Sequence, residues 1–170
     1  MKLSFGKVSL ILLVFFSSDY FVNSEIIDDD SLAKNNYKIN DIKTVLPTLK
    51  GGAKYVLAGI NFYGGVPILL PISYSSVNSL CKLMKKNKKM IIRVEGHSEA
   101  AGAPSLEILK ELSEQRARTV YKVLLANGIE KKRVSTIGFG SKYMLFPSRN
   151  ATEEERSANR RVEINVISIE

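Results

Sequence analysis

The chain has 170 residues, of which 45% are hydrophobic, 25% charged and 8% aromatic, and its formal net charge is +8. This length suits one globular domain with short extensions and excludes two full-sized domains. The single cysteine, Cys81, excludes an intrachain disulfide, and the single histidine, His97, excludes a metal site built from several histidines. Lys and Arg are mixed with Glu, and no aromatic stacking run accompanies them, so we expect no nucleic-acid partner.

The first 24 residues have the layout of a secretory signal peptide. Lys2 and Lys7 form a positive start, residues 8–16 form an apolar run, and residues 22–24 offer a small-residue cleavage site before Glu25. The apolar run is well short of the ~20 residues that a membrane-spanning helix needs. We therefore expect an exported protein, with a retained signal anchor as the alternative.

Residues 25–53 have the composition of a linker, and residues 54–170 that of a domain. The linker holds an acidic cluster, Pro47 and the pair Gly51-Gly52, with only scattered apolar residues. From residue 54 onward the apolar pattern tightens, and the excess of positive charge falls in this segment.

Hydrophobic periodicity in residues 54–170 predicts alternating strands and helices. The predicted strands are residues 55–62, 90–95, 133–139 and 160–169. The predicted helices are residues 73–86 and 105–127, with a short helical turn at 153–158. This order predicts a two-layer α/β sandwich with about four strands, in which the long helices favour parallel crossovers between the earlier strands.

The first predicted helix has an apolar stripe and a basic end. Cys81 lies on the stripe, which predicts burial in the core. The lysines at the end of the helix are Lys82, Lys85, Lys86, Lys88 and Lys89. The simplest interpretation of this cluster is a solvated helix end that complements the helix dipole.

Arg116 occupies a position on the long predicted helix where the spacing calls for an apolar residue. It lies four residues after Leu112 and four before Val120, on the stripe predicted to face the sheet. An arginine there needs a partner, because an unpaired charge is costly to bury. The partner is either a carboxylate of the protein, such as Glu99 or Glu95, or an acidic group of a ligand. Periodicity alone favours the internal partner.

Four short motifs in a fixed order carry a resemblance to a known family. They are GHSE at residues 96–99, LSEQRA at 112–117, IGFG at 137–140 and NRRVEI at 159–164. Together with the stretch from Ile60 to Ser73, they resemble the C-terminal domain of the OmpA family, from about residue 55 to the end of the chain. Each motif alone is weak evidence, but the ordered set with this spacing is specific.

The resemblance implies a βαβαββ-type fold with a mixed sheet and noncovalent binding of peptidoglycan, without catalysis or a cofactor. In the family, the diaminopimelate of the stem peptide is held by an acid of the first motif and an arginine of the second, with an arginine of the last motif nearby. The matching residues are Glu99, Arg116 and Arg160. The resemblance also implies the periplasm, or the periplasmic face of the outer membrane, in a Gram-negative bacterium, with outer-membrane or other envelope proteins as candidate partners.

This sequence departs from the family pattern at two positions of the expected site. The family's aspartate is Glu99 here, which keeps the charge but lengthens the side chain by one methylene. The family's asparagine before the second motif is Leu109 here, so an amide is replaced by an apolar group. These departures leave two hypotheses open: a binder with adapted geometry, or a retained scaffold with a degenerate site and a structural or protein-interaction role.

The residues offer little material for catalysis. A hydrolase acting on the wall is the least supported function, because no nucleophile–base set and no paired acids at a recognisable spacing occur. We expect no metal site. His97 lies in the loop after the second predicted strand, where we expect it to brace the loop through hydrogen bonds rather than to act as an acid or base.

Overall fold

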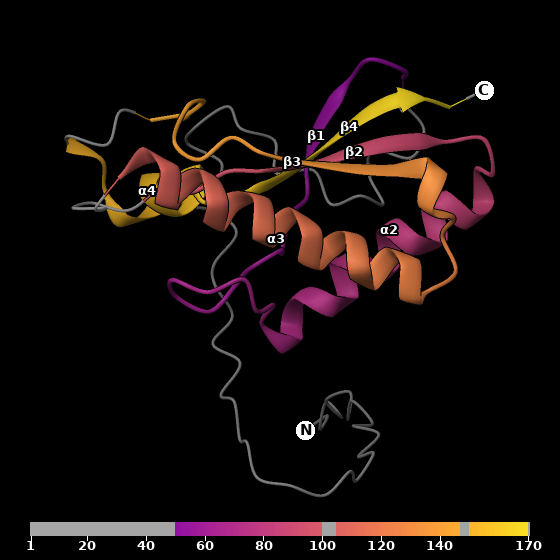
Figure 1. The fold of residues 1–170 in the computed structure, drawn as a ribbon, viewed down its shortest axis with the longest axis horizontal. Helices are drawn as coiled ribbons and strands as arrows, with labels where there is room; N and C mark the ends of the chain where they lie inside the picture. The colour runs from indigo at the N-terminus through magenta and orange to yellow at the C-terminus, as the bar shows by residue number, and fades with distance from the viewer. Residues whose placement is uncertain (1–49, 100–104, 147–149, 170) are drawn as a thin grey trace, which may run out of the picture. The chain divides into compact units, whose positions relative to one another are not determined.

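The computed structural model describes residues 50–99, 105–146 and 150–169 of the chain (Figure 1). The predicted signal peptide, residues 1–24, and all but the last four residues of the predicted linker, 25–53, lie outside the described residues. Within the described ranges, no helix combines the length and the apolar character that crossing a bilayer requires.

Strands and helices alternate along the described residues. The strands are β1 (Lys54–Val56), β2 (Ile91–Gly96), β3 (Val134–Gly138) and β4 (Val162–Ser168). The helices are α2 (Tyr74–Lys86), α3 (Leu106–Ala126) and α4 (Glu153–Asn159), with 3₁₀ turns η2 (Pro71–Ser73) and η3 (Lys131–Arg133). Apart from β1, each predicted element lies within two residues of its observed bounds.

The four strands form one mixed sheet in the order β1-β4-β2-β3, and α2 and α3 lie on one side of it (Figure 1). β2 and β3 are parallel, which confirms the crossover predicted through α3. β4 is antiparallel to both β1 and β2 and separates them. The helix α2 therefore joins two strands that are not neighbours, and the predicted two-layer architecture with a mixed sheet is confirmed.

The predicted strand at residues 55–62 is wrong in its length, because β1 ends at Val56. Gly59 adopts a positive φ of 72°, which turns the chain away from the sheet. Leu57 still donates its backbone N–H to Val162, but Phe62 forms only an isolated bridge with Leu69. The residues between β1 and α2 are thus a loop, and this loop reaches α3.

The core lies between the two long helices and the sheet. Ile92 and Val94 of β2 alternate toward it, as predicted, and are fully buried. Cys81 lies in the same cluster with 3% exposure, which confirms its predicted core role, and burial raises the pKa of its thiol.

Two glycines let α3 approach the ends of β2 and β3 very closely. A Cβ atom on Gly96 would overlap the backbone carbonyl of Ser113, and one on Gly138 would overlap the backbone of Glu114. Because these positions carry no side chain, the third turn of α3 lies directly against the sheet. Ser113 also accepts a hydrogen bond from the backbone N–H of Gly140, at 2.8 Å, and this fixes the loop after β3 to the same turn. Arg116 projects from the helical turn that follows.

Candidate functional site

Arg116 lies on the inner side of α3, and only 7% of its surface is exposed. Its guanidinium lies over the ring of Phe62, 5.1 Å from the centroid. Its Nη2 donates a long hydrogen bond of 3.5 Å to the backbone carbonyl of Tyr63. Its Nε is buried and has no hydrogen-bond partner among the described residues. The prediction that position 116 faces inward is therefore confirmed.

No carboxylate of the described residues forms an ion pair with Arg116. The internal partner favoured by periodicity, Glu99 or Glu95, is wrong within this part of the chain, because both acids are bound by other side chains. Burial, and then repulsion from the guanidinium of Arg160, lower the pKa of Arg116 below its ordinary value. The structure thus brings two positive charges together and leaves one of them buried without an acidic partner.

Glu99 lies in the segment that follows β2 and is buried, with 6% exposure. Its Oε2 accepts a hydrogen bond of 2.5 Å from the side-chain amide of Asn159, the last residue of α4. Its Oε1 is buried and has no partner among the residues described. One carboxylate oxygen is therefore held in place, and the other has unused capacity to accept a hydrogen bond.

Arg160 directly follows Asn159, so it lies one residue from the group that holds Glu99. Its Nη2 donates to Oε1 of Glu153 at 2.5 Å, and its side chain is 32% exposed. Within the described ranges, no hydrogen bond or ion pair joins Glu99 to either Arg160 or Arg116. The predicted site residues are therefore not joined to one another by direct contacts in the described ranges, and Glu99 is connected to Arg160 through the neighbouring Asn159.

The loop before Glu99 is fixed by backbone hydrogen bonds to the segment after β3. Ser98 donates to the carbonyl of Gly140 at 3.0 Å, and Phe139 donates to the carbonyl of Gly96 at 2.9 Å. Leu109, which stands where the family has an asparagine, is 6% exposed on α3. Its side chain has no polar atom, so it contributes packing and no hydrogen bond at this position.

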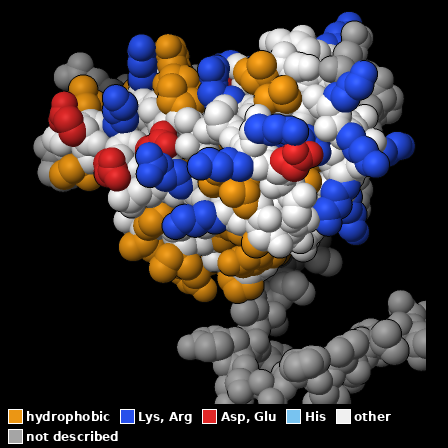
Figure 2. All heavy atoms as spheres, turned by 45° about the vertical axis from the view of Figure 1, so that its right-hand side comes forward, with side chains coloured by type: hydrophobic (Ala, Val, Ile, Leu, Met, Phe, Trp, Pro, Cys, Tyr) orange, Lys and Arg blue, Asp and Glu red, His pale blue; other side chains and the backbone are white. Residues whose placement is uncertain are grey.

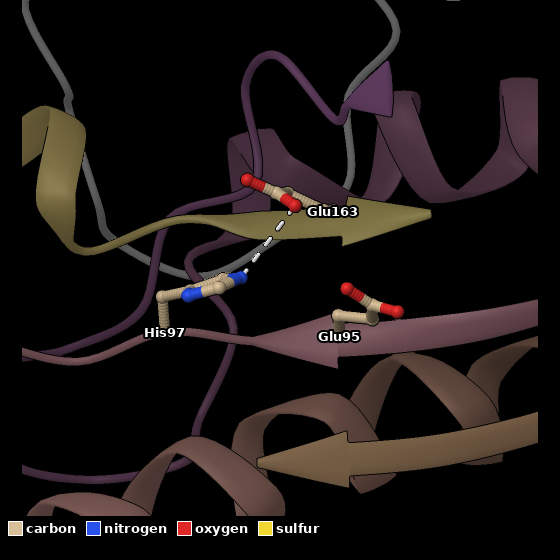
Figure 3. A group of neighbouring side chains, drawn as sticks. All are labelled: Glu95, His97 and Glu163. Carbon is tan, nitrogen blue, oxygen red and sulfur yellow. Dashed lines mark ion pairs between the residues drawn. The ribbon is translucent and has the colours of Figure 1, made fainter. Parts of the chain in front are cut away.

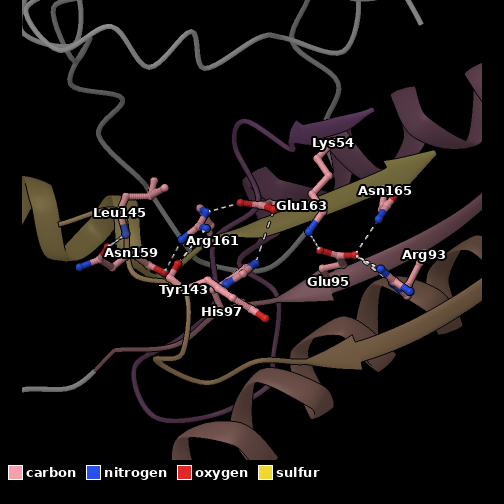
Figure 4. Close-up of polar contacts among 10 residues, drawn as sticks. All are labelled: Lys54, Arg93, Glu95, His97, Tyr143, Leu145, Asn159, Arg161, Glu163 and Asn165. Carbon is pink, nitrogen blue, oxygen red and sulfur yellow. Dashed lines mark hydrogen bonds and ion pairs between the residues drawn. The ribbon is translucent and has the colours of Figure 1, made fainter. Parts of the chain in front are cut away.

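A network of charged side chains covers the sheet face opposite the helices (Figure 4). Glu95 is fully buried at its centre. Its Oε2 accepts from Lys54 at 2.7 Å, and its Oε1 accepts from Arg93 at 2.9 Å and Asn165 at 3.1 Å. Burial alone would raise the pKa of Glu95, but these donors hold that pKa below its ordinary value. The carboxylate therefore stays ionised inside the network.

Glu163 and His97 form the second part of the network. Arg161 donates to Oε1 of Glu163 at 2.6 Å, and Nε2 of His97 lies 3.6 Å from Oε2 of Glu163. Burial alone would raise the pKa of Glu163, but the neighbouring His97 and Arg161 hold that pKa at about 2. The ring nitrogens of His97 make no short hydrogen bond within the described part of the chain, and the residue braces the loop through its backbone N–H, which donates to the carbonyl of Arg161 at 2.9 Å. The ring instead contacts Phe139, with 5.5 Å between the ring centroids.

Glu95, His97 and Glu163 each offer one potential metal-ligand atom, and these three atoms lie within 4.8 Å of one another (Figure 3). The carboxylate of Glu163 faces the His97 ring (Figure 3), whereas Glu95 is bound by Lys54 and Arg93. A metal ion would have to displace the lysine and arginine donors that already balance both carboxylates. We therefore assign this cluster a structural role.

Sequence reasoning missed Asn159 and the charged network. The available signal for the network was the i, i+2 pairing of opposite charges, Arg93 with Glu95 and Arg161 with Glu163, on the strand positions that alternate away from the core. The signal for Asn159 was its place immediately before the expected site arginine. A side-chain amide at the end of a short helix belongs to no repeating sequence pattern from which its partner could be predicted.

The segment that contains the site matches the model of a known protein family. A model of the OmpA family matches residues 61–160, which is more than half of the chain. The chain belongs to the OmpA family. The matched segment of this OmpA-family protein contains Glu99, Arg116 and Arg160, together with Asn159.

Two curated relatives show how far the similarity extends. The peptidoglycan-binding protein ArfA of Mycobacterium bovis is 30% identical over 140 residues, which cover 78% of this chain and 42% of that protein. Outer membrane porin F of Pseudomonas aeruginosa is 37% identical over 95 residues, covering 55% of this chain and 26% of that protein. The chain thus spans less than half the length of each of these relatives.

Solved structures of the same fold include MotB and a MotB-like protein. A MotB-like protein from Desulfovibrio vulgaris is 27% identical, with a TM-score of 0.57 over 66% of this chain and 72% of that one. The periplasmic domain of Helicobacter pylori MotB is 25% identical, with a TM-score of 0.55 over 65% of this chain and 69% of that one. The OmpA-family assignment therefore rests on both sequence and fold.

Proposed function

We propose that this OmpA-family protein binds peptidoglycan noncovalently through the stem peptide and thereby attaches an exported envelope protein to the cell wall. The single observation that carries the proposal is the buried guanidinium of Arg116, which has no carboxylate partner among the described residues. A buried cation without a counterion is costly, and an acidic ligand group would remove that cost.

The ligand that this arrangement suits is the zwitterionic end of diaminopimelate, which carries an ammonium and a carboxylate on one carbon. Arg116 would bind the carboxylate with its planar fork, and Glu99 would accept from the ammonium through its unpartnered Oε1. Arg160, which already contacts Glu153, would add positive charge at the rim. This site would read charge and shape without any bond being formed or broken.

Each charge-assisted hydrogen bond contributes on the order of 1.5–3 kcal/mol, and less where water reaches it. A single site would therefore bind with modest affinity. Peptidoglycan repeats its stem peptides, and many nearby sites raise the effective concentration of ligand around a protein that has just dissociated. A weak, reversible site is thus sufficient for attachment to a polymer.

The name of the ArfA relative supports a peptidoglycan ligand, and the family supports a location in the cell envelope. We take residues 1–24 as a signal peptide, 25–53 as a linker and 54–170 as the binding domain. On this proposal the protein works in the periplasm or on the periplasmic face of the outer membrane. Other envelope proteins are its candidate partners, and it has no enzymatic step.

Contacts that Arg116 and Glu99 already make within the protein favour a second function. The ring of Phe62 and the carbonyl of Tyr63 already contact Arg116, and Asn159 already binds Glu99. If these contacts close the site, the domain is a scaffold with a degenerate site and a role in protein interactions. The 3.5 Å length of the Tyr63 contact favours the binding site, because a hydrogen bond of that length is weak and easily exchanged for a ligand carboxylate.

The test is co-sedimentation of the 170-residue chain with purified peptidoglycan sacculi. We expect the wild-type chain to pellet and the Arg116→Gln variant to remain in the supernatant. The matched control is Arg118→Gln, which removes an exposed arginine two residues away that pairs with Glu114. Equal pelleting of both variants would overturn the site, and a folded wild-type chain that does not pellet would establish the scaffold.

A further inference from the structure

The end of the domain where α2 finishes and β2 begins carries a group of lysines, here called the basic end. Its members are Lys82, Lys85, Lys86, Lys88 and Lys89 from α2 and the following turn, and Lys131 and Lys132 from η3. All seven are exposed. The sequence has no acidic residue between Lys54 and Val94. Figure 2, which turns this side toward the viewer, shows blue side chains far outnumbering red ones.

Buried Arg133 holds the basic end together. Its guanidinium donates to the backbone carbonyls of Met84 at 2.8 Å, Asn87 at 2.7 Å and Met90 at 3.0 Å. These bonds tie η3 to the end of α2 and to the turn before β2. The two groups of lysines therefore share one surface although about forty residues separate them in the chain.

Helix-end complementarity does not account for this many lysines. The carbonyls at the end of α2 already have donors, since Arg133 binds Met84 and the side chain of Asn87 donates to Leu83 at 3.0 Å. None of the five lysines of α2 and its turn pairs with a carboxylate in the described ranges. Lys132, paired with Glu130 at 2.8 Å, is the exception in η3. Apart from Lys132, the lysines of the basic end thus carry positive charge that no ion pair among the described residues neutralises.

The basic end lies at the opposite end of the sheet from the proposed wall-binding site. β2 starts beside Lys89 and runs toward Glu99, and its six residues span about 20 Å at ~3.3 Å per residue. A surface that bound the same stem peptide would be expected close to Arg116. The basic end therefore fits a separate partner.

Two isoleucines are exposed at the same end, on the sheet face opposite the helices. Ile91 of β2 is 37% exposed and Ile167 of β4 is 50% exposed. Ile91 pairs with Ser168 and Ile92 pairs with Val166, so the register shift between them leaves Ile167 as an extra residue of β4 beside Ile91. Apolar side chains beside a field of lysines are typical of a surface that lies on a membrane.

We infer that the basic end docks on an anionic phospholipid bilayer, a contact separate from the proposed wall attachment. Lysine suits this partner, because its point charge on a flexible chain can follow a fluid array of phosphate headgroups. A single-stranded nucleic acid would call for aromatic stacking residues, and the basic end contains none. With the wall site at the other end, the domain would bridge a membrane surface and peptidoglycan.

The test is co-sedimentation of the 170-residue chain with vesicles of phosphatidylcholine, with and without phosphatidylglycerol. The probe variant is Lys85→Gln with Lys89→Gln, and the matched control is Lys110→Gln with Lys142→Gln, two exposed lysines outside the basic end. Binding to pure phosphatidylcholine measures any contribution from the apolar run at residues 8–16, which both variants keep.

We expect the wild-type chain to prefer the phosphatidylglycerol vesicles, and high salt to abolish that preference. Each lysine removed should lower the partition coefficient about 5-fold, so the probe variant should lose about 25-fold and the control much less. Sacculus pelleting should be unchanged in the probe variant, which separates this proposal from the wall site. Equal losses in both variants, or a loss on sacculi rather than on vesicles, would overturn the inference.

Discussion

The side-chain amide of Asn159 donates to Oε2 of Glu99 at 2.5 Å, although 60 residues separate the two in the chain. The same amide nitrogen donates to the carbonyl of Phe146, and the amide oxygen accepts from the backbone N–H groups of Leu145 and Phe146. One side chain thus connects the acid of the proposed site, the end of α4 and the loop after β3. Removing this side chain should lower both the stability of the domain and its binding to sacculi.

Replacing Asn159 with alanine should destabilise the domain and weaken its binding to sacculi. The change removes the Asn159 partner of a carboxylate oxygen, of one backbone carbonyl and of two backbone N–H groups, at a cost of about 1–3 kcal/mol for each group that stays buried and unpaired. Urea denaturation measures the loss. Asn165→Ala is the control, because Glu95 keeps Lys54 and Arg93 as donors and should lose less. A larger loss in the control would contradict this role of Asn159.

Arg116→Leu should separate binding from stability. The spacing of α3 calls for an apolar residue at this position, and the arginine there is buried without an acidic partner among the described residues. Leucine removes the desolvation cost, so the free energy of unfolding should stay within about 1 kcal/mol of wild type or increase. Sacculus binding should nevertheless be lost. A large fall in thermal midpoint would show that Arg116 is a structural residue.

Gly96→Ala should destabilise the fold, because the added Cβ would overlap the carbonyl oxygen of Ser113. α3 would have to move off the sheet, which costs about 1–3 kcal/mol or more. Gly64→Ala is the control, since a Cβ at Gly64 meets nothing within 4 Å and should change stability by less than about 0.5 kcal/mol. Chemical denaturation of the two variants side by side checks the difference; equal stabilities would contradict the close packing.

Stability should fall as the pH is lowered through the range in which Glu163 is protonated. Its pKa drops from an ordinary 4.5 to about 2 in the folded protein, so its contribution is complete above about pH 4.5 and is lost as the pH falls to about 2. This shift corresponds to about 3 kcal/mol at most. Between neutral pH and about pH 3, the free energy of unfolding should change less for Glu163→Gln than for wild type. Glu111→Gln, at an exposed position, should keep the wild-type dependence of unfolding free energy on pH. The same dependence in Glu163→Gln would contradict a stabilising role for the Glu163 carboxylate.

Local patterns predicted the parts of the fold that depend on neighbours in sequence. The 3.6-residue period gave α2 and α3 within two residues, and the same period identified Arg116 as an inward-facing charge. The length of β1 was wrong because apolar character continues past Val56, whereas the positive φ of Gly59 ends the strand. Periodicity carries no information on that turn.

Contacts between segments that are distant in the chain could not be predicted from the sequence. Nothing in the order of the elements indicated that β4 would lie between β1 and β2. Glu95 and Glu163 alternate away from the core, and the simple expectation for such positions is exposure to solvent. Both are buried because cations lie over them: Lys54 of β1 over Glu95, and Arg161, two residues earlier in the chain, over Glu163. Strand alternation alone does not reveal these contacts.

The most direct test of the central claim is competition for sacculus binding by free diaminopimelate, with Nα-acetyl-lysine amide as the matched competitor. This compound keeps the ammonium at the end of the side chain, but its α-amino and α-carboxyl groups are blocked, so it offers no zwitterion to a site made by Arg116 and Glu99. We expect diaminopimelate to release the wild-type chain from sacculi and the blocked lysine not to do so. Release by both compounds alike, or by neither, would contradict it.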